Sequence, residues 1–135
     1  MIRDAVEDYR RALPPDGSHP FLARTPERFG LSVWGVVLEG PGHQIPHIHS
    51  EAWLSGVYYA QLPDAVRTSG NRHAGWIEFG RPPQQLHCAA GPEVRLVRPE
   101  EGLMVLFPSY FYHRTVPTES AGMRISISFD VLAYE

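Results

Sequence analysis

Residues 29–38 read FGLSVWGVVL, a run rich in aromatic and β-branched side chains that stops at the turn sequence Gly40-Pro41-Gly42. Such a composition, bounded by glycine and proline, is typical of a β-strand. Further short runs of this kind follow at residues 45–49, 53–62, 75–79, 93–97, 103–107, 113–116 and 123–133. Roughly eight short strands separated by turns predict two facing antiparallel sheets. The sequence therefore favours an all-β protein, with a jelly-roll or cupin-like barrel as the leading architecture.

The residues before this region follow a different pattern. Apolar side chains recur at roughly helical spacing from Ala5 to Leu13, and Pro14-Pro15 ends the pattern. Residues 3–13 are therefore expected to form a short amphipathic helix that caps the barrel. A chain of 135 residues has the size of one domain. We expect residues 1–28 to be the helix and its connection, and residues 29–135 to be the barrel.

Composition excludes several classes of partner. The chain is 43% hydrophobic and 20% charged, with a formal net charge of -3, so no positive field would recruit nucleic acid or an anionic membrane. No segment approaches the ~20 apolar residues of a membrane span, and the first residues lack a secretory signal, which indicates a cytoplasmic protein. The single cysteine, Cys88, excludes an internal disulfide and a cysteine-based zinc site. An edge strand or the N-terminal helix could still build a homodimer.

Two histidines in the segment Pro46-His47-Ile48-His49 stand two residues apart. In an extended strand, such residues point to the same face and could share one metal ion. A third histidine, His113, follows the apolar run at residues 103–108 and could meet the pair from a neighbouring strand. Three histidine ligands suit iron, zinc, copper or nickel and leave positions open for substrate.

The alternative is that an H-x-H pair arises by chance and that its rings are only solvated. The chain has seven histidines. His43 precedes the pair by about one turn and is a spare candidate ligand. The remaining three sit beside turn residues and are expected to be surface groups: His19, His73 and His87.

Strict alternation marks residues 124–130, RISISFD. It places Arg124, Ser126, Ser128 and Asp130 on one face of a strand and apolar side chains on the other. The polar row could face solvent. If it faces inward, Arg124 needs an anion, because an unpaired buried charge is costly, and a guanidinium with a nearby hydroxyl is well formed to hold a carboxylate.

With these motifs in this order, the chain resembles the iron(II)- and 2-oxoglutarate-dependent oxygenases, and within them a bacterial and phage branch. The resemblance covers roughly residues 32–131. It rests on four motifs: His47-Ile48-His49, Ser55-Gly56-Val57-Tyr58-Tyr59, Phe107-Pro108-Ser109 with His113, and Arg124-Ile125-Ser126-Ile127-Ser128-Phe129. The resemblance implies a double-stranded β-helix, an iron(II) ion and the cosubstrate 2-oxoglutarate.

The resemblance also implies roles for individual residues. His47 and His113 would bind iron, and Arg124 with Ser126 would anchor the distal carboxylate of 2-oxoglutarate, with Tyr58 or Tyr59 also in contact. His49 departs from the general pattern, because it stands where the family usually has an aspartate ligand. We expect His49 to be the third ligand, since its spacing from His47 matches that aspartate. If it is not a ligand, Glu51 or a vacant position would take its place.

Three functions are compatible with the sequence. The first is a non-haem iron(II)/2-oxoglutarate-dependent dioxygenase, which oxidises a C–H bond of a small-molecule or peptide substrate. The second is a cupin-type enzyme that uses three histidines without 2-oxoglutarate, since residues 102–108 with His113 resemble the second cupin motif. The third is a non-catalytic barrel that binds a small ligand. Arg124 discriminates the first from the second, and the loops at residues 63–74 and 80–92 carry no motif that names a substrate.

Overall fold

The structure is a computed structural model of the whole chain, and it describes residues 1–40, 46–64, 66, 73–83, 91, 93–118 and 122–134. Three residues singled out above lie outside these ranges: His43, His87 and Cys88. Within them the chain forms one α-helix, one 3-10 helix and seven strands. None of the helices in these ranges is both long enough and apolar enough to cross a membrane.

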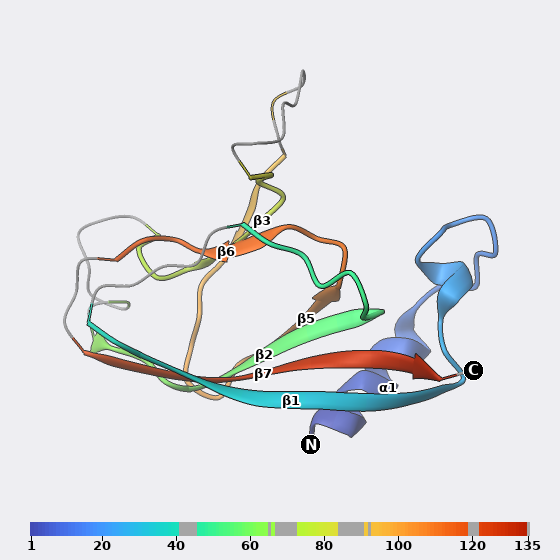
Figure 1. Cartoon of the computed structure of the whole chain (residues 1–135), viewed down its shortest axis with the longest axis horizontal. Coiled ribbons are helices and arrows are strands. Elements are labelled where there is room, and N and C mark those ends of the chain that lie inside the picture. Colours follow the sequence, from blue (N-terminus) through green and yellow to red (C-terminus); the bar gives the residue numbers. More distant parts are fainter. Residues whose placement is uncertain are drawn as a thin grey trace.

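The strands form two antiparallel sheets that face each other (Figure 1). The larger sheet has the order β1-β7-β2-β5, and the smaller has the order β4-β3-β6. The bounds of the strands are β1 Arg28–Glu39, β2 Leu54–Gln61, β3 Ile77–Phe79, β4 Arg95–Val97, β5 Met104–Pro108, β6 His113–Thr115 and β7 Met123–Tyr134. This two-sheet arrangement confirms the prediction of an all-β, double-stranded β-helix architecture.

The prediction of a strand at residues 45–49 is wrong. Of the residues 45–49, Ile45 lies outside the described ranges, and the others contain only an isolated bridge between His47 and His113. Pro46 cannot donate a ladder hydrogen bond, and the segment turns away after His49. The other expected strands are present, with ends that shift by a few residues.

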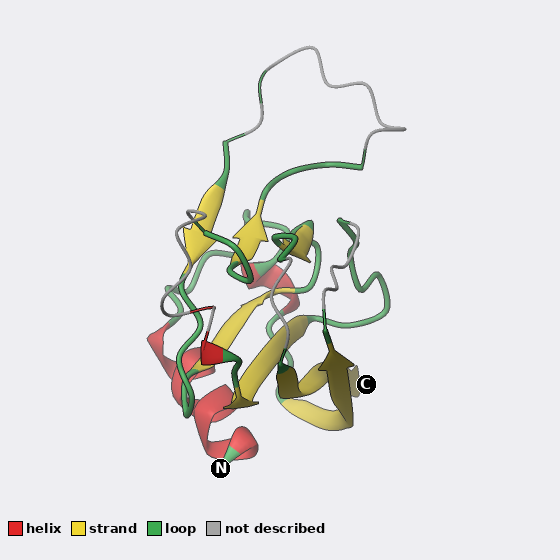
Figure 2. Cartoon of the chain, turned by 90° about the vertical axis from the view of Figure 1, so that its left-hand side faces the viewer, coloured by secondary structure: helices red, strands yellow, loops and turns green. Residues whose placement is uncertain are grey.

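Helix α1, Ile2–Ala12, covers the outer face of the larger sheet. It ends one residue before the predicted end, because Leu13 adopts extended torsions before Pro14. Its fully buried Val6 belongs to a core with Leu54, Phe129 and Val131. Figure 2 shows the helix on the outside of the strands. The helix thus covers the sheet from outside, which leaves the space between the two sheets for the site.

A second, smaller core lies between the sheets. Ile77 and Phe79 of β3 pack against Phe107 of β5, with ring centroids of the two phenylalanines 4.9 Å apart. This core holds the smaller sheet at one place over the inner face of the larger sheet. Beside it the two sheets enclose a cavity, which holds the residues considered next.

Candidate metal centre

Three histidines converge at one end of the space between the sheets. The backbones of His47 and His113 exchange two N–H···O hydrogen bonds of 3.1 Å, and the His49 amide donates to the Ser109 carbonyl at 3.1 Å. The ring centroids of His47 lie 4.1 Å from those of His113 and 5.3 Å from those of His49. Each ring offers a nitrogen, and these nitrogens lie within 4.8 Å of one another. The structure therefore brings together all three predicted metal ligands, although their segment is not a regular strand.

His113 is held in the form that a metal ion requires. Its ring is buried, and its Nδ1 lies 3.1 Å from the carbonyl oxygen of Phe111. Because a carbonyl can only accept, Nδ1 must carry the proton, which leaves the Nε2 lone pair available. Burial lowers the pKa of His113 to about 4, against the opposing effect of the Phe111 hydrogen bond. The imidazole is therefore neutral near neutral pH.

His49 is supported by a residue to which the sequence assigned no role. Asp130 of β7 lies with Oδ1 at 2.7 Å from His49 Nδ1, and Ser55 Oγ donates to the same Oδ1 at 2.7 Å. Trp34 of β1 stacks beside the His49 ring, with centroids 6.0 Å apart. The alternation of residues 124–130 had placed Asp130 on the same face as Arg124. It could not show which histidine the carboxylate meets.

The other candidate ligands lie elsewhere. Glu51 is exposed and is not part of the histidine cluster. His19 accepts a hydrogen bond from the Phe21 amide at 3.2 Å, at the start of the 3-10 helix Leu22–Arg24. His73 stacks against Trp76 with centroids 4.6 Å apart. His19 is exposed, as expected from its neighbours in the sequence, whereas His73 is half-buried.

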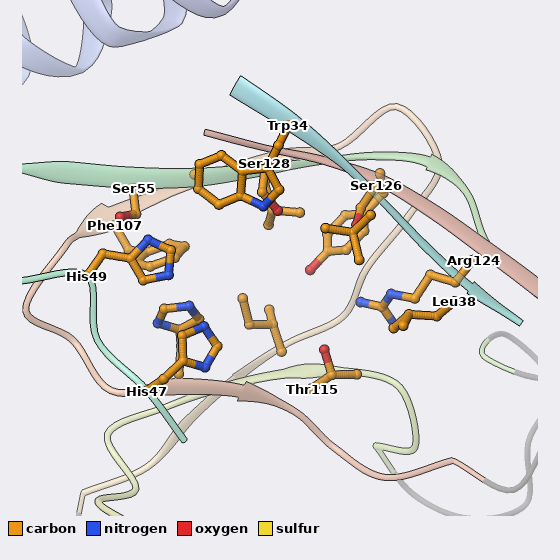
Figure 3. A pocket seen from close by; sticks show the side chains of 16 residues that line it. Trp34, Leu38, His47, His49, Ser55, Phe107, Thr115, Arg124, Ser126 and Ser128 are labelled. Carbon is orange, nitrogen blue, oxygen red and sulfur yellow. The ribbon is translucent and has the colours of Figure 1, made fainter. Parts of the chain in front are cut away.

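A cavity of about 110 Å³ extends from the histidine cluster between the two sheets. Figure 3 shows His47 and His49 at one end of it and Arg124 at the other, with Thr115 and Ser126 between them. Strand register explains this row, because Trp34, Val36 and Leu38 of β1 pair in turn with Ser128, Ser126 and Arg124 of β7. The polar face of β7 therefore points into the cavity and not to solvent.

Arg124 is a buried cation at the far end of this cavity. It is 8% exposed, its Nη1 donates to the Gly75 carbonyl at 2.8 Å, and its guanidinium lies 5.2 Å from the centre of the Tyr59 ring. Gly75 has a φ of +80°, a backbone conformation that residues other than glycine rarely adopt. In the described part of the chain no carboxylate is paired with Arg124. A buried guanidinium in this state favours an anionic ligand.

The remaining predicted contacts separate into two groups. Ser126 is 6% exposed and lines the cavity, as does Tyr59. Tyr58 is not among the cavity residues, because alternation along β2 directs it to the opposite face. Only one member of the tyrosine pair can therefore touch a ligand in this cavity. Burial raises the pKa of Tyr59, while the charge of Arg124 opposes the rise, so its hydroxyl stays protonated at neutral pH.

Comparison with known proteins agrees with this geometry. A family model described as "Putative 2OG-Fe(II) oxygenase" matches residues 32–130, well over half of the chain. The chain belongs to this oxygenase family. The expected resemblance is thereby confirmed, and the family implies iron(II) and 2-oxoglutarate as cofactors. No curated protein matches this sequence.

A solved structure has a similar fold. The crystal structure of a Pseudomonas putida prolyl-4-hydroxylase is similar to this chain, with a TM-score of 0.54 and 14% sequence identity. The match covers 78% of this chain and 52% of the hydroxylase chain. This chain therefore spans about half the length of that hydroxylase, and at this identity the likeness concerns the fold.

The residues present fit both cofactors. Three imidazoles, of which His113 is held neutral, form a nitrogen donor set that suits iron(II). The buried Arg124 lies at the other end of the same cavity, with Ser126 between it and the histidines, and its guanidinium would suit a carboxylate. A dicarboxylate such as 2-oxoglutarate has two anionic ends, and this cavity offers a place for each.

Proposed function

We propose that this chain is an iron(II)- and 2-oxoglutarate-dependent oxygenase of the hydroxylase type, which oxidises a C–H bond of its substrate. The observation that carries the proposal is a cavity with a three-histidine cluster at one end and, at the other, a buried guanidinium that pairs with no carboxylate among the residues the structure describes. His47, His49 and His113 would hold the iron. Arg124, Ser126 and Tyr59 would hold the distal carboxylate of 2-oxoglutarate.

The two cofactors supply the oxidising chemistry when bound: 2-oxoglutarate, dioxygen and the substrate give succinate, carbon dioxide and a hydroxylated product. The residues of the chain bind and orient. Arg124 would fix the cosubstrate by a bidentate, charge-assisted contact, so that its other end faces the histidines. Val57 and Phe107 form apolar walls of the cavity between the histidines and Arg124.

The alternative of a three-histidine enzyme without 2-oxoglutarate gives Arg124 no ligand. In such a protein the guanidinium would be buried at a cost and without an anion. The alternative of a non-catalytic barrel gives the convergence of three imidazoles no purpose and predicts no stoichiometric metal. The described geometry supports the oxygenase over both.

The test is reconstitution of protein purified without a histidine tag. Iron(II) is added anaerobically, 2-oxoglutarate is added, and succinate is measured after exposure to air. We expect about one iron per chain and succinate release that needs both additions. His113→Ala should lose both, whereas His73→Asn, a change at a histidine outside the cluster, should keep both. Iron binding without any turnover of 2-oxoglutarate contradicts the proposal in favour of the second alternative, and no iron contradicts it in favour of the third.

A further inference from the structure

The contact between Asp130 and His49 joins two residues 81 positions apart in the chain. Asp130 lies on the inner face of β7, opposite Ser55 of β2 in the strand register. Its side chain is 18% exposed and that of His49 is 20% exposed, so water screens their interaction only in part. Among the residues that the structure describes, Asp130 is the carboxylate hydrogen-bonded to the histidine cluster.

We propose that Asp130 is a positioning residue that holds His49 in the tautomer and orientation needed for metal binding and places a negative charge behind the ring. This inference rests on the proposed function, because it takes His49 as a ligand. Asp130 is not among the residues whose ligand atoms converge, and its Oδ1 contacts Nδ1 of His49, which leaves Nε2 of that ring for a metal ion.

The tautomer follows from the chemistry of the two partners. An ionised carboxylate can only accept hydrogen bonds, so the proton of a neutral His49 must sit on Nδ1, which donates to Asp130. The nitrogen left with a free lone pair is then Nε2. Ser55 donates to the same carboxylate oxygen and thereby fixes the position of Asp130 itself. Trp34 flanks the ring of His49 and limits its rotation.

The role of the negative charge follows from the charges of the candidate ligands. Three neutral imidazoles bring no negative charge to offset a divalent cation. A carboxylate bonded to the outer nitrogen of one imidazole makes that ring a more basic ligand and supplies part of the missing charge. Loss of a carboxylate partner of this kind typically lowers metal affinity by about 10- to 100-fold.

The first measurement is the affinity for Co(II) in proteins without a tag. Binding is monitored by the visible absorption bands of the bound ion. Asp130→Asn keeps the shape and an accepting oxygen but removes the charge. We expect it to weaken Co(II) binding by about 10- to 100-fold. Ser55→Ala, which frees the carboxylate without removing it, should weaken binding less. Asp8→Asn, the same change on the exposed face of α1, should leave the affinity unchanged. Equal affinity of Asp130→Asn and the wild type would overturn the inference.

The second measurement separates a role through His49 from a general effect on the fold. His49→Ala is combined with Asp130→Asn, and the Co(II) affinities of the four proteins form a double-mutant cycle. If Asp130 acts through His49, the aspartate substitution should change the affinity less than about threefold once the ring is absent. Equal effects with and without His49 overturn the inference. Thermal unfolding of the metal-free proteins shows whether each variant is folded.

A third measurement uses the Zn(II)-loaded protein and its nitrogen-15 NMR spectrum. The proton on His49 Nδ1 should be visible and slow to exchange in the wild type, and lost to exchange in Asp130→Ala. Its presence on Nε2 would overturn the inference even if the metal affinities agreed with it. Failure of the proposed function looks different. If Co(II) binding depends on Asp130 but the protein does not turn over 2-oxoglutarate, the inference about Asp130 is supported and the proposed oxygenase function is contradicted. A wild type that binds no Co(II) overturns both.

Discussion

The outer and inner faces of the four-stranded sheet are built by the same strands, yet they hold different kinds of residue. On the outer face, Phe129 and Val131 of β7 are fully buried under helix α1. On the inner face, Arg124, Ser126 and Asp130 of the same strand line or adjoin the cavity. The outer face supplies apolar burial, which is the main source of folding stability. The inner face buries polar groups instead of apolar ones. Such burial lowers the stability of the fold but provides the groups of a binding site. Substitutions on the two faces should therefore have separable effects.

The largest effect is expected on the outer face, from Phe129→Ala. The ring is fully buried and packs over Gly56 of β2, so its removal leaves a cavity in the main core. Such changes cost about 3–5 kcal/mol, which corresponds to a fall in Tm of roughly 10–20 °C for a chain of this size. Phe129→Leu should show a smaller fall and remain folded. Below its Tm, the leucine variant should bind Co(II) as the wild type does; a loss of affinity there would show that the two faces are not independent.

The largest expected effect on the inner face comes from Arg124→Ala. Loss of a charge-assisted hydrogen-bond partner costs about 1.5–3 kcal/mol, so the KM for 2-oxoglutarate should rise roughly 10- to 150-fold. The Co(II) affinity should stay close to that of the wild type, because the guanidinium lies at the other end of the cavity (Figure 3). Arg124→Lys should recover only part of the loss, since an ammonium cannot make the bidentate contact. Arg28→Ala, an exposed arginine on β1, is the matched control. An unchanged KM in Arg124→Ala would count against the cosubstrate site.

Gly56→Ala tests the packing of the outer face from β2, the strand next to β7. A methyl group at this position would collide with the ring of Phe129, so the strand or the ring must shift. Overpacking of this kind costs about 1–3 kcal/mol in the free energy of unfolding, measured with urea. When Gly56→Ala is combined with Phe129→Leu or Phe129→Ala, the costs should be less than additive, because the smaller side chain leaves room for the methyl group. Full additivity would show that the collision is not the cause.

The sequence predicted the face pattern of β7 but not how each face is covered. Alternation separated Arg124, Ser126 and Asp130 from Ile125, Ile127 and Phe129, and this separation depends only on the period of an extended chain. Whether the polar face meets solvent or a cavity depends on where helix α1 packs, and that contact joins the two ends of the chain. The alternation therefore leaves open whether the polar face is buried. The burial of Arg124 in the structure shows that this face lines the cavity.

The histidine cluster shows the same limit. Spacing alone brought His47 and His49 together, although the segment is only a single bridge and not the expected strand. A ladder needs a partner strand along its length, which no local pattern supplies. The role of Asp130 depended on a contact across 81 positions, and the separate placement of Tyr58 and Tyr59 depended on the register of β2 against β7. The candidate ligands could be named from the sequence, whereas the contacts that support them needed the fold.

The smallest effect is expected from Ser126→Ala, which tests whether the inner face recognises its ligand by more than charge. Ser126 is 6% exposed and pairs with Val36 on one side and Tyr59 on the other, in the row that leads from the histidines to Arg124. A single neutral hydrogen bond contributes about 0.5–1.5 kcal/mol, so the KM for 2-oxoglutarate should rise only about 2- to 10-fold. Ser32→Ala makes the same chemical change at an exposed position of β1 and should leave the KM unchanged. In the Arg124→Ala background, loss of the Ser126 hydroxyl should matter less, because the carboxylate is no longer held against it. An equal effect in both backgrounds would mean that Ser126 only shapes the wall of the cavity and that Arg124 recognises the carboxylate without it.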